Sequence, residues 1–210
     1  MITRIAVLVS GGGTNLQALI DARDRGELPH GALALVVSNS EGAYALKRAE
    51  KAGIPTALCL RAKGMSRSDF EARLLDILSE NRIDMIVLAG FMAILSADFV
   101  GHYPDRIINI HPSLIPSFCG EGFYGLRVHR AALDYGVKVT GATVHYVNEI
   151  PDGGRIIAQK AVDILPGDTP ETLQRRVMEQ AEWILLPRAA EEVAEKLGIG
   201  NEELGMRNGG

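Results

Sequence analysis

Apolar segments alternate with amphipathic segments along the first half of the chain, and this alternation predicts strands and helices in turn. Short apolar runs, rich in β-branched residues, predict buried strands at 2–9, 33–38, 56–60, 85–89 and 107–111. Apolar positions at helical spacing, with capping residues or Gly and Pro at their ends, predict helices that begin near 14, 43, 66 and 96. This order is typical of a doubly wound, mostly parallel sheet of the α/β class, with a Rossmann-like arrangement.

The pattern changes after residue 116. A Gly- and aromatic-rich surface loop over 117–125 precedes a predicted helix, 126–135, and a strand, 138–147, in which apolar and polar residues alternate. A last strand is predicted over 155–165, and its direction, parallel or antiparallel, is left open by the pattern.

A long helix is predicted at the C-terminal end of the chain. Thr169 and Pro170 form a capping signal at its start. Its predicted inner face consists of the apolar residues Leu173, Val177, Ile184 and Leu185. With no internal repeat or linker in the sequence, we expect one domain over 1–197 and a frayed polar tail over 198–210.

Composition and charge narrow the class of function. The chain has 210 residues, a formal net charge of -4 and no basic run, which argues against nucleic acid but not against a small phosphorylated ligand. No apolar run is long enough to span a membrane, and no secretory pattern opens the sequence. Cys59 and Cys119 favour free thiols in a reducing cytoplasm, and the five histidines lack the spacing of metal ligands.

The strand at 107–111 ends in residues that can do chemistry. Asn109 and His111 are two positions apart, so their side chains leave the same face of an extended chain. Pro112 keeps His111 in extended geometry, and ligands of open α/β sheets bind outside the carboxyl ends of strands. The pair therefore predicts an amide donor beside an imidazole at a ligand site, although the same residues could simply finish a strand and cap a turn.

The segment 10–15, Ser-Gly-Gly-Gly-Thr-Asn, predicts a phosphate-binding loop between a strand and a helix. Its glycines permit close approach of backbone N–H groups to an anion, and the helix N-terminus adds free donors. Leu16 stands where the dinucleotide motif has its third glycine, and no Gly-Lys-Ser/Thr follows, so a monophosphate fits better than a nucleotide. A Gly-rich turn without a ligand is the alternative.

Asp152, in Pro-Asp-Gly-Gly, is a candidate only if its loop folds back onto His111. An Asp before Gly is ordinary turn chemistry, but beside His111 it would favour the imidazolium and make that ring a charged donor near neutral pH. The other histidines are expected to be structural, with His145 in the core or at its rim and the rest in surface or capping positions. The latter are His30, His102 and His129.

Taken together, five motifs in this order resemble the phosphoribosylglycinamide formyltransferases, folate-dependent enzymes of purine synthesis. They are SGGGTNLQ at 10–17, LAGFM at 88–92, NIHPSL at 109–114, GATVH at 141–145 and DGG at 152–154. The resemblance covers residues 2 to about 195. The NIHPSL motif is shared with other formyl-folate enzymes, whereas the glycine-rich loop and the chain length indicate the glycinamide ribonucleotide branch.

The resemblance implies roles for individual residues. The catalytic residues would be Asn109, His111 and Asp152. The phosphoribosylglycinamide site would include Gly12, Gly13, Thr14, Asn15, Leu16 and Glu182, the last on the ribose. The folate side would include Arg67, Met92, Ala93, Ile94, Leu95, Asn109, Asn148, Glu149 and Asp152.

The chain departs from the family pattern at three residues and one loop. Ala93 stands where many relatives have Arg, which removes a side-chain contact but leaves backbone contacts to the pterin. Trp183 and Arg127 each replace a His found in relatives, and the 117–125 loop is longer than usual.

The activity implied by the resemblance is transfer of a formyl group from 10-formyltetrahydrofolate to the glycinamide amine. The folate is a co-substrate, so no tightly bound cofactor and no metal are expected, and the protein would be a cytoplasmic monomer or homodimer. Formyltetrahydrofolate hydrolysis and formylation of methionyl-tRNA are alternatives, but those relatives usually carry a further domain for which 210 residues leave no room. A non-catalytic phosphate-ligand sensor on the same fold is a third alternative; it would bind ligand without turnover.

Overall fold

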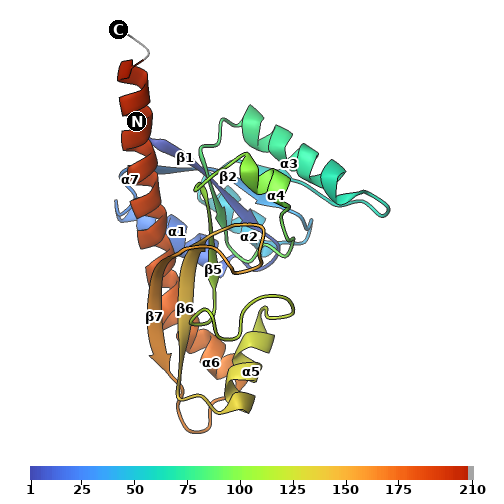
Figure 1. Cartoon of the computed structure of the whole chain (residues 1–210), viewed down its shortest axis with the longest axis vertical. Coiled ribbons are helices and arrows are strands. Elements are labelled where there is room, and N and C mark those ends of the chain that lie inside the picture. The colour runs from blue at the N-terminus through green and yellow to red at the C-terminus, as the bar shows by residue number, and fades with distance from the viewer. Residues whose placement is uncertain (208–210) are drawn as a thin grey trace.

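The computed structural model describes the backbone of residues 1–207 and the side chains of residues 1–199. The strands are β1 Thr3–Val9, β2 Gly31–Ser38, β3 Thr56–Leu58, β4 Met85–Leu88, β5 Ile107–His111, β6 Val139–Tyr146 and β7 Ile156–Asp163. They form a single seven-stranded sheet in the order β3-β2-β1-β4-β5-β6-β7 (Figure 1).

Five of these strands are parallel, and the sheet ends in an antiparallel pair. All pairings from β3 across to β5 are parallel, whereas β6 is antiparallel to β5 and β7 is antiparallel to β6. The chain first builds outward from β1 to β3 and then returns to β4 on the other side of β1, which makes the β1–β4 boundary the switch point of the sheet. The predicted doubly wound, mostly parallel sheet is confirmed.

Helices fill the connections between the strands. They are α1 Thr14–Asp24, α2 Tyr44–Lys51, α3 Arg67–Glu80, α4 Ala97–Gly101, α5 Leu126–Tyr135, α6 Pro170–Val177 and α7 Trp183–Arg207. Local capping explains three starts, because Ser66, Ser96 and Thr169 each accept a hydrogen bond from the backbone N–H three residues later. The helix starts predicted from these residues are therefore confirmed.

The two faces of the sheet have separate hydrophobic cores, since successive strand side chains point to opposite faces. On β1, Ile5 and Val7 pack with residues of α1, α2, α6 and α7, whereas Ala6 and Leu8 pack with residues of α3 and α4. Figure 1 shows α7 running along one edge of the body and α3 and α4 on the other side. All four of these β1 side chains are fully buried, as expected for a strand covered on both faces.

The predicted long C-terminal helix is interrupted by one turn of π-helix, Met178–Glu182, between α6 and α7. A π turn inserts a residue into the helical repeat and rotates everything after it relative to an uninterrupted helix. Leu173, Val177 and Leu185 are buried as predicted, but Ile184 is only half-buried and Leu186 takes its place in the core. The prediction of the inner face was wrong at Ile184 because the pattern assumed one continuous helix.

The C-terminal helix continues through Arg207, into the segment predicted to be a frayed tail over 198–210. Residues 208–210 lie outside the described residues, so the division into a domain over 1–197 and a tail stays a prediction. Within residues 1–207, no helix combines the length and apolar character needed to cross a bilayer.

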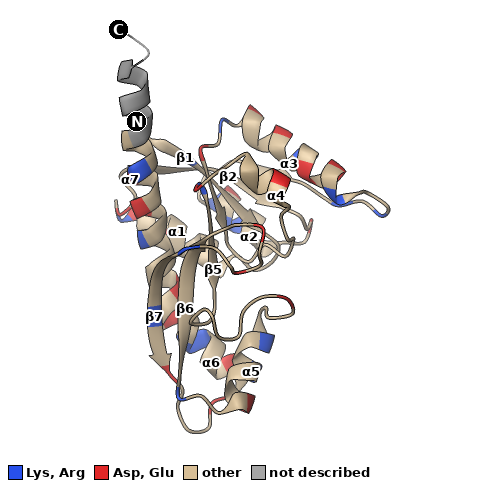
Figure 2. Ribbon diagram, in the orientation of Figure 1, with Lys and Arg blue, Asp and Glu red and all other residues tan. Residues whose placement is uncertain are grey.

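Charges of both signs are spread over the outer helices and loops, whereas β5 and β6 carry neither sign (Figure 2). Positive charge at a ligand site near β5 and β6 would therefore have to come from side chains of neighbouring helices or loops. Cys59 is fully buried, as predicted, and both cysteines are free thiols.

Candidate active site

The carboxyl ends of β1, β4 and β5 meet at the switch point of the sheet. The 10–15 loop follows β1, the segment 90–95 follows β4, and β5 ends at His111. The Ser10 hydroxyl accepts a hydrogen bond of 2.8 Å from the Met92 backbone N–H, which ties the first two segments together. The glycine-rich loop and the end of β4 thus border one region of the molecule.

Asn109, His111 and Asp152, here called the polar triplet, lie together in this region. Asn109 Nδ2 is 3.5 Å from Asp152 Oδ1, and His111 Nδ1 is 3.4 Å from Asp152 Oδ2. The loop after β6 folds back onto the end of β5, which is the condition under which Asp152 was expected to take part in chemistry. The structure brings the three side chains together, and their roles stay predictions.

The Asp152 carboxylate is held by several donors. The Gly120 backbone N–H donates to Oδ2 at 2.8 Å, and the Asp152 backbone itself has a left-handed φ of 56°. Burial acts to raise the pKa of Asp152, but hydrogen bonding to His145, the charge of His111 and the Gly120 N–H together bring it below its ordinary value. The carboxyl is therefore ionised at neutral pH.

His145 is a fourth member of this cluster. From the sequence it was predicted only to lie in the core or at its rim. It is buried, and its Nδ1 donates to the Tyr146 carbonyl at 2.8 Å, so Nε2 faces the triplet. Nε2 lies 3.2 Å from Asn109 Nδ2 and 3.5 Å from Asp152 Oδ1. The signal that was missed is strand pairing, because His145 is directly opposite Asn109 in the antiparallel register of β5 and β6.

The 117–125 loop covers His111. The His111 Nε2–H donates to the Phe118 carbonyl at 2.9 Å, which leaves Nδ1 facing Asp152. Burial lowers the pKa of His111 and outweighs the opposing effects of Asp152 and of the Phe118 hydrogen bond. Burial therefore acts against the expectation that Asp152 keeps this imidazole charged, while in either protonation state Nε2–H is the donor that the loop occupies.

A cleft of about 620 Å³ opens beside the polar triplet. It is lined by the segment after β4, the 120–125 part of the loop and the loop that carries Asp152. Among the predicted folate residues, those that line the cleft are Met92, Ala93, Ile94, Leu95, Asn109, Asn148 and Asp152. Met92, Ile94 and Ile150 are each more than half exposed, so the cleft offers apolar surface to a flat ligand.

Arg67 and Glu149, also predicted on the folate side, lie outside the lining of the cleft. Arg67 Nε donates to Glu71 at 3.1 Å, and Glu71 in turn accepts a hydrogen bond from the Ser96 backbone N–H at 2.7 Å. Arg67 is thus linked to the segment behind the cleft through the buried Glu71.

The 10–15 loop has the geometry of an anion-binding turn. Gly13 is the N-cap of α1 with a left-handed φ of 71° and provides no side-chain cap, so the first N–H groups of the helix remain available to a ligand. A Cβ at Gly13 would lie 2.6 Å from the Ala45 Cβ, which only glycine avoids. Leu16 is fully buried, so of the predicted binding residues it can offer only its backbone.

Asn15 and Glu182 meet beside this loop. Asn15 Nδ2 donates to Glu182 Oε2 at 2.7 Å, and Asn15 Oδ1 is buried without a hydrogen-bond partner among the described residues. Burial raises the pKa of Glu182 to about 7, although the Asn15 hydrogen bond acts in the opposite direction. The π turn ends at Glu182, so the interruption of the helix is what places this carboxyl against α1.

His129 was predicted to be a surface or capping group, and this prediction was wrong. It lies on the inner face of α5, fully buried, and neither ring nitrogen has a partner among the described residues. Burial, with a smaller effect from nearby His111, lowers its pKa to about 4, so the ring is neutral. By contrast, His30 and His102 are exposed, as predicted.

Known proteins resemble this chain over most of its length. Residues 3–189 match the formyl transferase family. The chain is 46% identical over 187 residues to the trifunctional purine biosynthetic protein adenosine-3 of Drosophila melanogaster, covering 89% of this chain but only 13% of that protein. The chain therefore spans a small part of such trifunctional relatives.

Two further relatives match over most of their own length. The chain is 42% identical over 177 residues to phosphoribosylglycinamide formyltransferase of Haemophilus influenzae, which covers 84% of this chain and 81% of the relative. The crystal structure of glycinamide ribonucleotide transformylase 1 from Symbiobacterium toebii superposes with a TM-score of 0.86 at 42% identity, over 93% of this chain and 89% of that one.

Proposed function

The chain belongs to the formyl transferase family, and on this premise we propose that it transfers the formyl group of 10-formyltetrahydrofolate to the amine of 5-phosphoribosylglycinamide. The names of the relatives at 42% identity support this acceptor over water or tRNA. The observation that carries the proposal is the position of the polar triplet, in a cleft at the carboxyl ends of β4 and β5 whose Met92 is bonded to Ser10 at the start of the 10–15 loop.

The proposed reaction is an acyl transfer. The amine nitrogen attacks the formyl carbon, the bond from that carbon to N10 of the folate breaks, and one proton passes from the amine to N10. The products are formylglycinamide ribonucleotide and tetrahydrofolate, so atoms and charges balance without a metal or a redox step.

Asn109 and His111 would stabilise the oxyanion that forms at the formyl oxygen. Asn109 Nδ2–H and His111 Nε2–H are both fixed donors at the end of β5. The formyl oxygen would take the place of the Phe118 carbonyl on His111. Removing one donor of this kind typically reduces the rate by about 10²–10³-fold.

Asp152 would assist transfer of the proton that the amine loses. Its ionised carboxylate faces His111 Nδ1, so it stabilises positive charge on the ring as the oxyanion develops. Through a water molecule, the same carboxylate would accept the proton that the amine loses. General acid–base assistance of this kind contributes about 10²–10⁴-fold.

The remaining roles follow the two sides of the site. The folate would bind in the large cleft against the 92–95 segment, where Ala93 leaves contact to the backbone, and against Asn148. The phosphoribosyl group would lie on the 10–15 loop, with its hydroxyls toward Asn15 and Glu182. We also propose a cytoplasmic location and a monomer or homodimer.

A formyl-transfer assay with both substrates tests the proposal. We expect wild-type turnover to require the amine, with a loss of about 10²–10³-fold in His111→Ala and of about 10²–10⁴-fold in Asp152→Asn. Near-wild-type turnover in either variant would contradict its assigned role, and folate consumption without the amine would indicate a hydrolase.

Exposed residues of the same types provide matched controls. His102→Ala and Asp163→Asn remove a surface imidazole and a surface carboxylate, and both should retain wild-type turnover. Tight binding of phosphoribosylglycinamide with no turnover in the wild type would instead favour a non-catalytic sensor.

A further inference from the structure

The 10–15 loop lacks a positive charge of its own. No Lys or Arg occurs between residues 9 and 22, and the chain as a whole is negative at -4. Backbone N–H groups and a helix N-terminus attract an anion, but a phosphate dianion is bound more strongly where a cationic side chain completes the site. A cationic side chain for this loop therefore has to come from another segment of the chain.

Arg48 on α2 reaches this loop. Its Nε donates to the Gly12 carbonyl at 2.9 Å and its Nη1 donates to Gln17 Oε1 at 2.9 Å. The Tyr44 ring lies 5.1 Å from the guanidinium carbon, which adds a cation–π contact. The guanidinium is thus fixed in position from three sides, and none of these contacts uses Nη2.

The same helix turns the loop toward a ligand. Ala45 N–H donates to the Gly11 carbonyl at 3.1 Å, and Arg48 takes the next carbonyl, that of Gly12. Two successive carbonyl oxygens that would repel a phosphate therefore bond to α2 instead. Gly13 packs directly against Ala45, which holds this arrangement in place.

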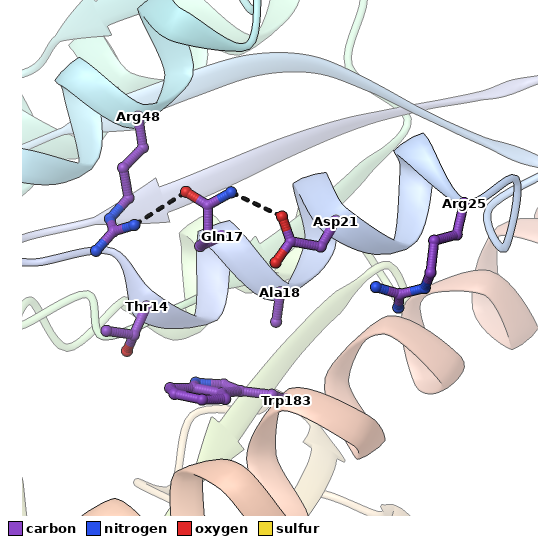
Figure 3. A pocket seen from close by; sticks show the side chains of 7 residues that line it. All are labelled: Thr14, Gln17, Ala18, Asp21, Arg25, Arg48 and Trp183. Atoms are coloured by element: carbon purple, nitrogen blue, oxygen red, sulfur yellow. Dashed lines mark hydrogen bonds between the residues drawn. The ribbon is translucent and has the colours of Figure 1, made fainter.

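A groove of about 300 Å³ connects Arg48 to the start of α1. In Figure 3 the Thr14 side chain lies between Arg48 of α2 and the Trp183 indole at the start of α7. Gln17 lines the same groove and holds Arg48 at its edge. A ligand with one end on the N–H groups of the loop would therefore have a guanidinium on one side and a flat apolar wall on the other.

An independent observation at the same helix start also indicates a ligand. Asn15 is nine-tenths buried, and its Oδ1 has no partner among the described residues although its Nδ2 is bonded to Glu182. A free acceptor next to a carboxyl suits sugar hydroxyls, whereas Arg48 and the N–H groups suit a phosphate. The polarity of the site thus matches a sugar phosphate.

We propose that Arg48 binds the phosphate of 5-phosphoribosylglycinamide and orients the 10–15 loop for it. The proposal rests on the proposed function for the identity of the substrate, but the phosphate chemistry can be tested without turnover. Arg48 is a binding residue in this scheme, since it contacts the phosphate and not the reacting atoms.

Steady-state kinetics of Arg48→Gln and Arg48→Lys provide the first test. A lost charge-assisted hydrogen bond corresponds to a rise of about 10–100-fold in the KM for phosphoribosylglycinamide. The KM for 10-formyltetrahydrofolate should stay within about twofold, and Arg48→Lys, which keeps the charge, should be intermediate. A folate KM that rises in parallel would overturn the proposal.

The dephosphorylated substrate, glycinamide riboside, separates direct phosphate binding from a merely structural role. Wild type and Arg48→Gln should turn it over at nearly the same low rate, because the interaction that the variant lacks is absent from both. Equal relative losses with the phosphorylated and dephosphorylated substrates would show that Arg48 only supports the fold. Arg25→Gln, at the far end of the same groove and bonded to Glu27, is the matched control and should behave as wild type.

Calorimetry with inorganic phosphate keeps the test independent of the proposed function. We expect the wild type to bind phosphate at least about 10-fold more tightly than Arg48→Gln, with Arg25→Gln unchanged. Equal affinities in wild type and Arg48→Gln would overturn the assignment of Arg48. A wild type that binds phosphate in this way but does not formylate the amine would leave Arg48 assigned and reject the proposed function.

Discussion

The 10–15 loop and the 117–125 loop are both predicted to border the substrates and each contain three glycines, but they are held by different parts of the molecule. The first is fixed by its neighbours in the scaffold, since α2 bonds to the carbonyls of Gly11 and Gly12. The second is fixed by the triplet itself, through His111 to the Phe118 carbonyl and through Asp152 to the Gly120 N–H.

This difference separates a preformed site from one that has to be rearranged. The N–H groups of the 10–15 loop are free for an anion in the structure as it stands, so binding costs little reorganisation. The 117–125 loop instead occupies the His111 donor that the proposed chemistry needs. Folate and amine would therefore have to replace its hydrogen bonds to His111 and Asp152, so we expect substrate binding to rearrange this loop.

Alanine substitutions at one glycine in each loop test whether the 10–15 loop is packed more tightly than the 117–125 loop, and we expect them to give the largest difference. Gly13 and Gly120 both have left-handed φ values, but a Cβ at Gly13 would overlap Ala45 at 2.6 Å, whereas a Cβ at Gly120 would meet nothing within 4 Å. We expect Gly13→Ala to lower the free energy of unfolding by about 3–4 kcal/mol, from strain plus overpacking. Gly120→Ala should lower it by about 1 kcal/mol, from strain alone.

Urea unfolding of the two variants measures this difference directly. Glycine to alanine at either position changes the unfolded chain in the same way, so the contrast reports the folded loops. Equal losses of stability in both variants would show that the 10–15 loop is no more tightly packed than the 117–125 loop, and would remove the basis of the comparison.

The two regions also differ in how far the sequence predicts them. The glycine-rich turn before α1, the capping residues Ser66 and Thr169, and the shared face of Asn109 and His111 are local patterns, and each one has the predicted geometry. Local patterns can be read from sequence because their causes, a positive φ, a cap or a pleat, lie within a few residues.

The rest of the site depends on contacts between distant segments. His145 faces Asn109 only because β6 pairs with β5 in one antiparallel register, and Phe118 meets His111 only because its loop folds over the end of β5. No local pattern predicts that the loop carrying Asp152 returns to His111, and only the family resemblance implied it. The π turn that aims Glu182 has no sequence signal that we could identify.

The pH dependence of stability extends the comparison to Glu182, which is bonded to Asn15 at the end of the 10–15 loop. Burial raises its pKa to about 7 in the folded protein, against 4.5 as the ordinary value. Between these values the folded protein holds a proton that the unfolded chain has released, so the free energy of unfolding falls as the pH rises through this window. The shift corresponds to about 3 kcal/mol, present in full below pH 4.5 and lost above pH 7.

Glu182→Gln should remove this fall while keeping an oxygen acceptor for Asn15. Urea unfolding at intervals between pH 4.5 and 7 gives the difference between variant and wild type, which should grow in favour of the variant as the pH rises. Parallel curves over the whole window would show that the carboxyl is not buried as the π turn places it.

His129, on the helix that follows the 117–125 loop, should show the opposite slope. Its pKa is lowered from 6.5 to about 4, first by burial, so the unfolded chain takes up a proton that the folded protein excludes. Stability therefore falls as the pH falls below 6.5, by about 2 kcal/mol between pH 6.5 and about pH 5. Over this range the effect of His129 opposes that of Glu182, so the free energy of unfolding of the wild type changes little. A variant that lacks one of the two groups therefore shows the pH dependence caused by the other.

His129→Leu and His129→Phe both remove the titration but differ in how well they fill the space on α5. We expect the two variants to differ in absolute stability, because Leu and Phe differ in shape and volume from the imidazole that they replace. Both should lose the acid-side fall and follow the slope set by Glu182, with stability rising as the pH falls from 6.5 to 5. A wild-type slope retained in both variants would mean that the His129 ring is already open to water in the folded protein, which contradicts its burial on α5.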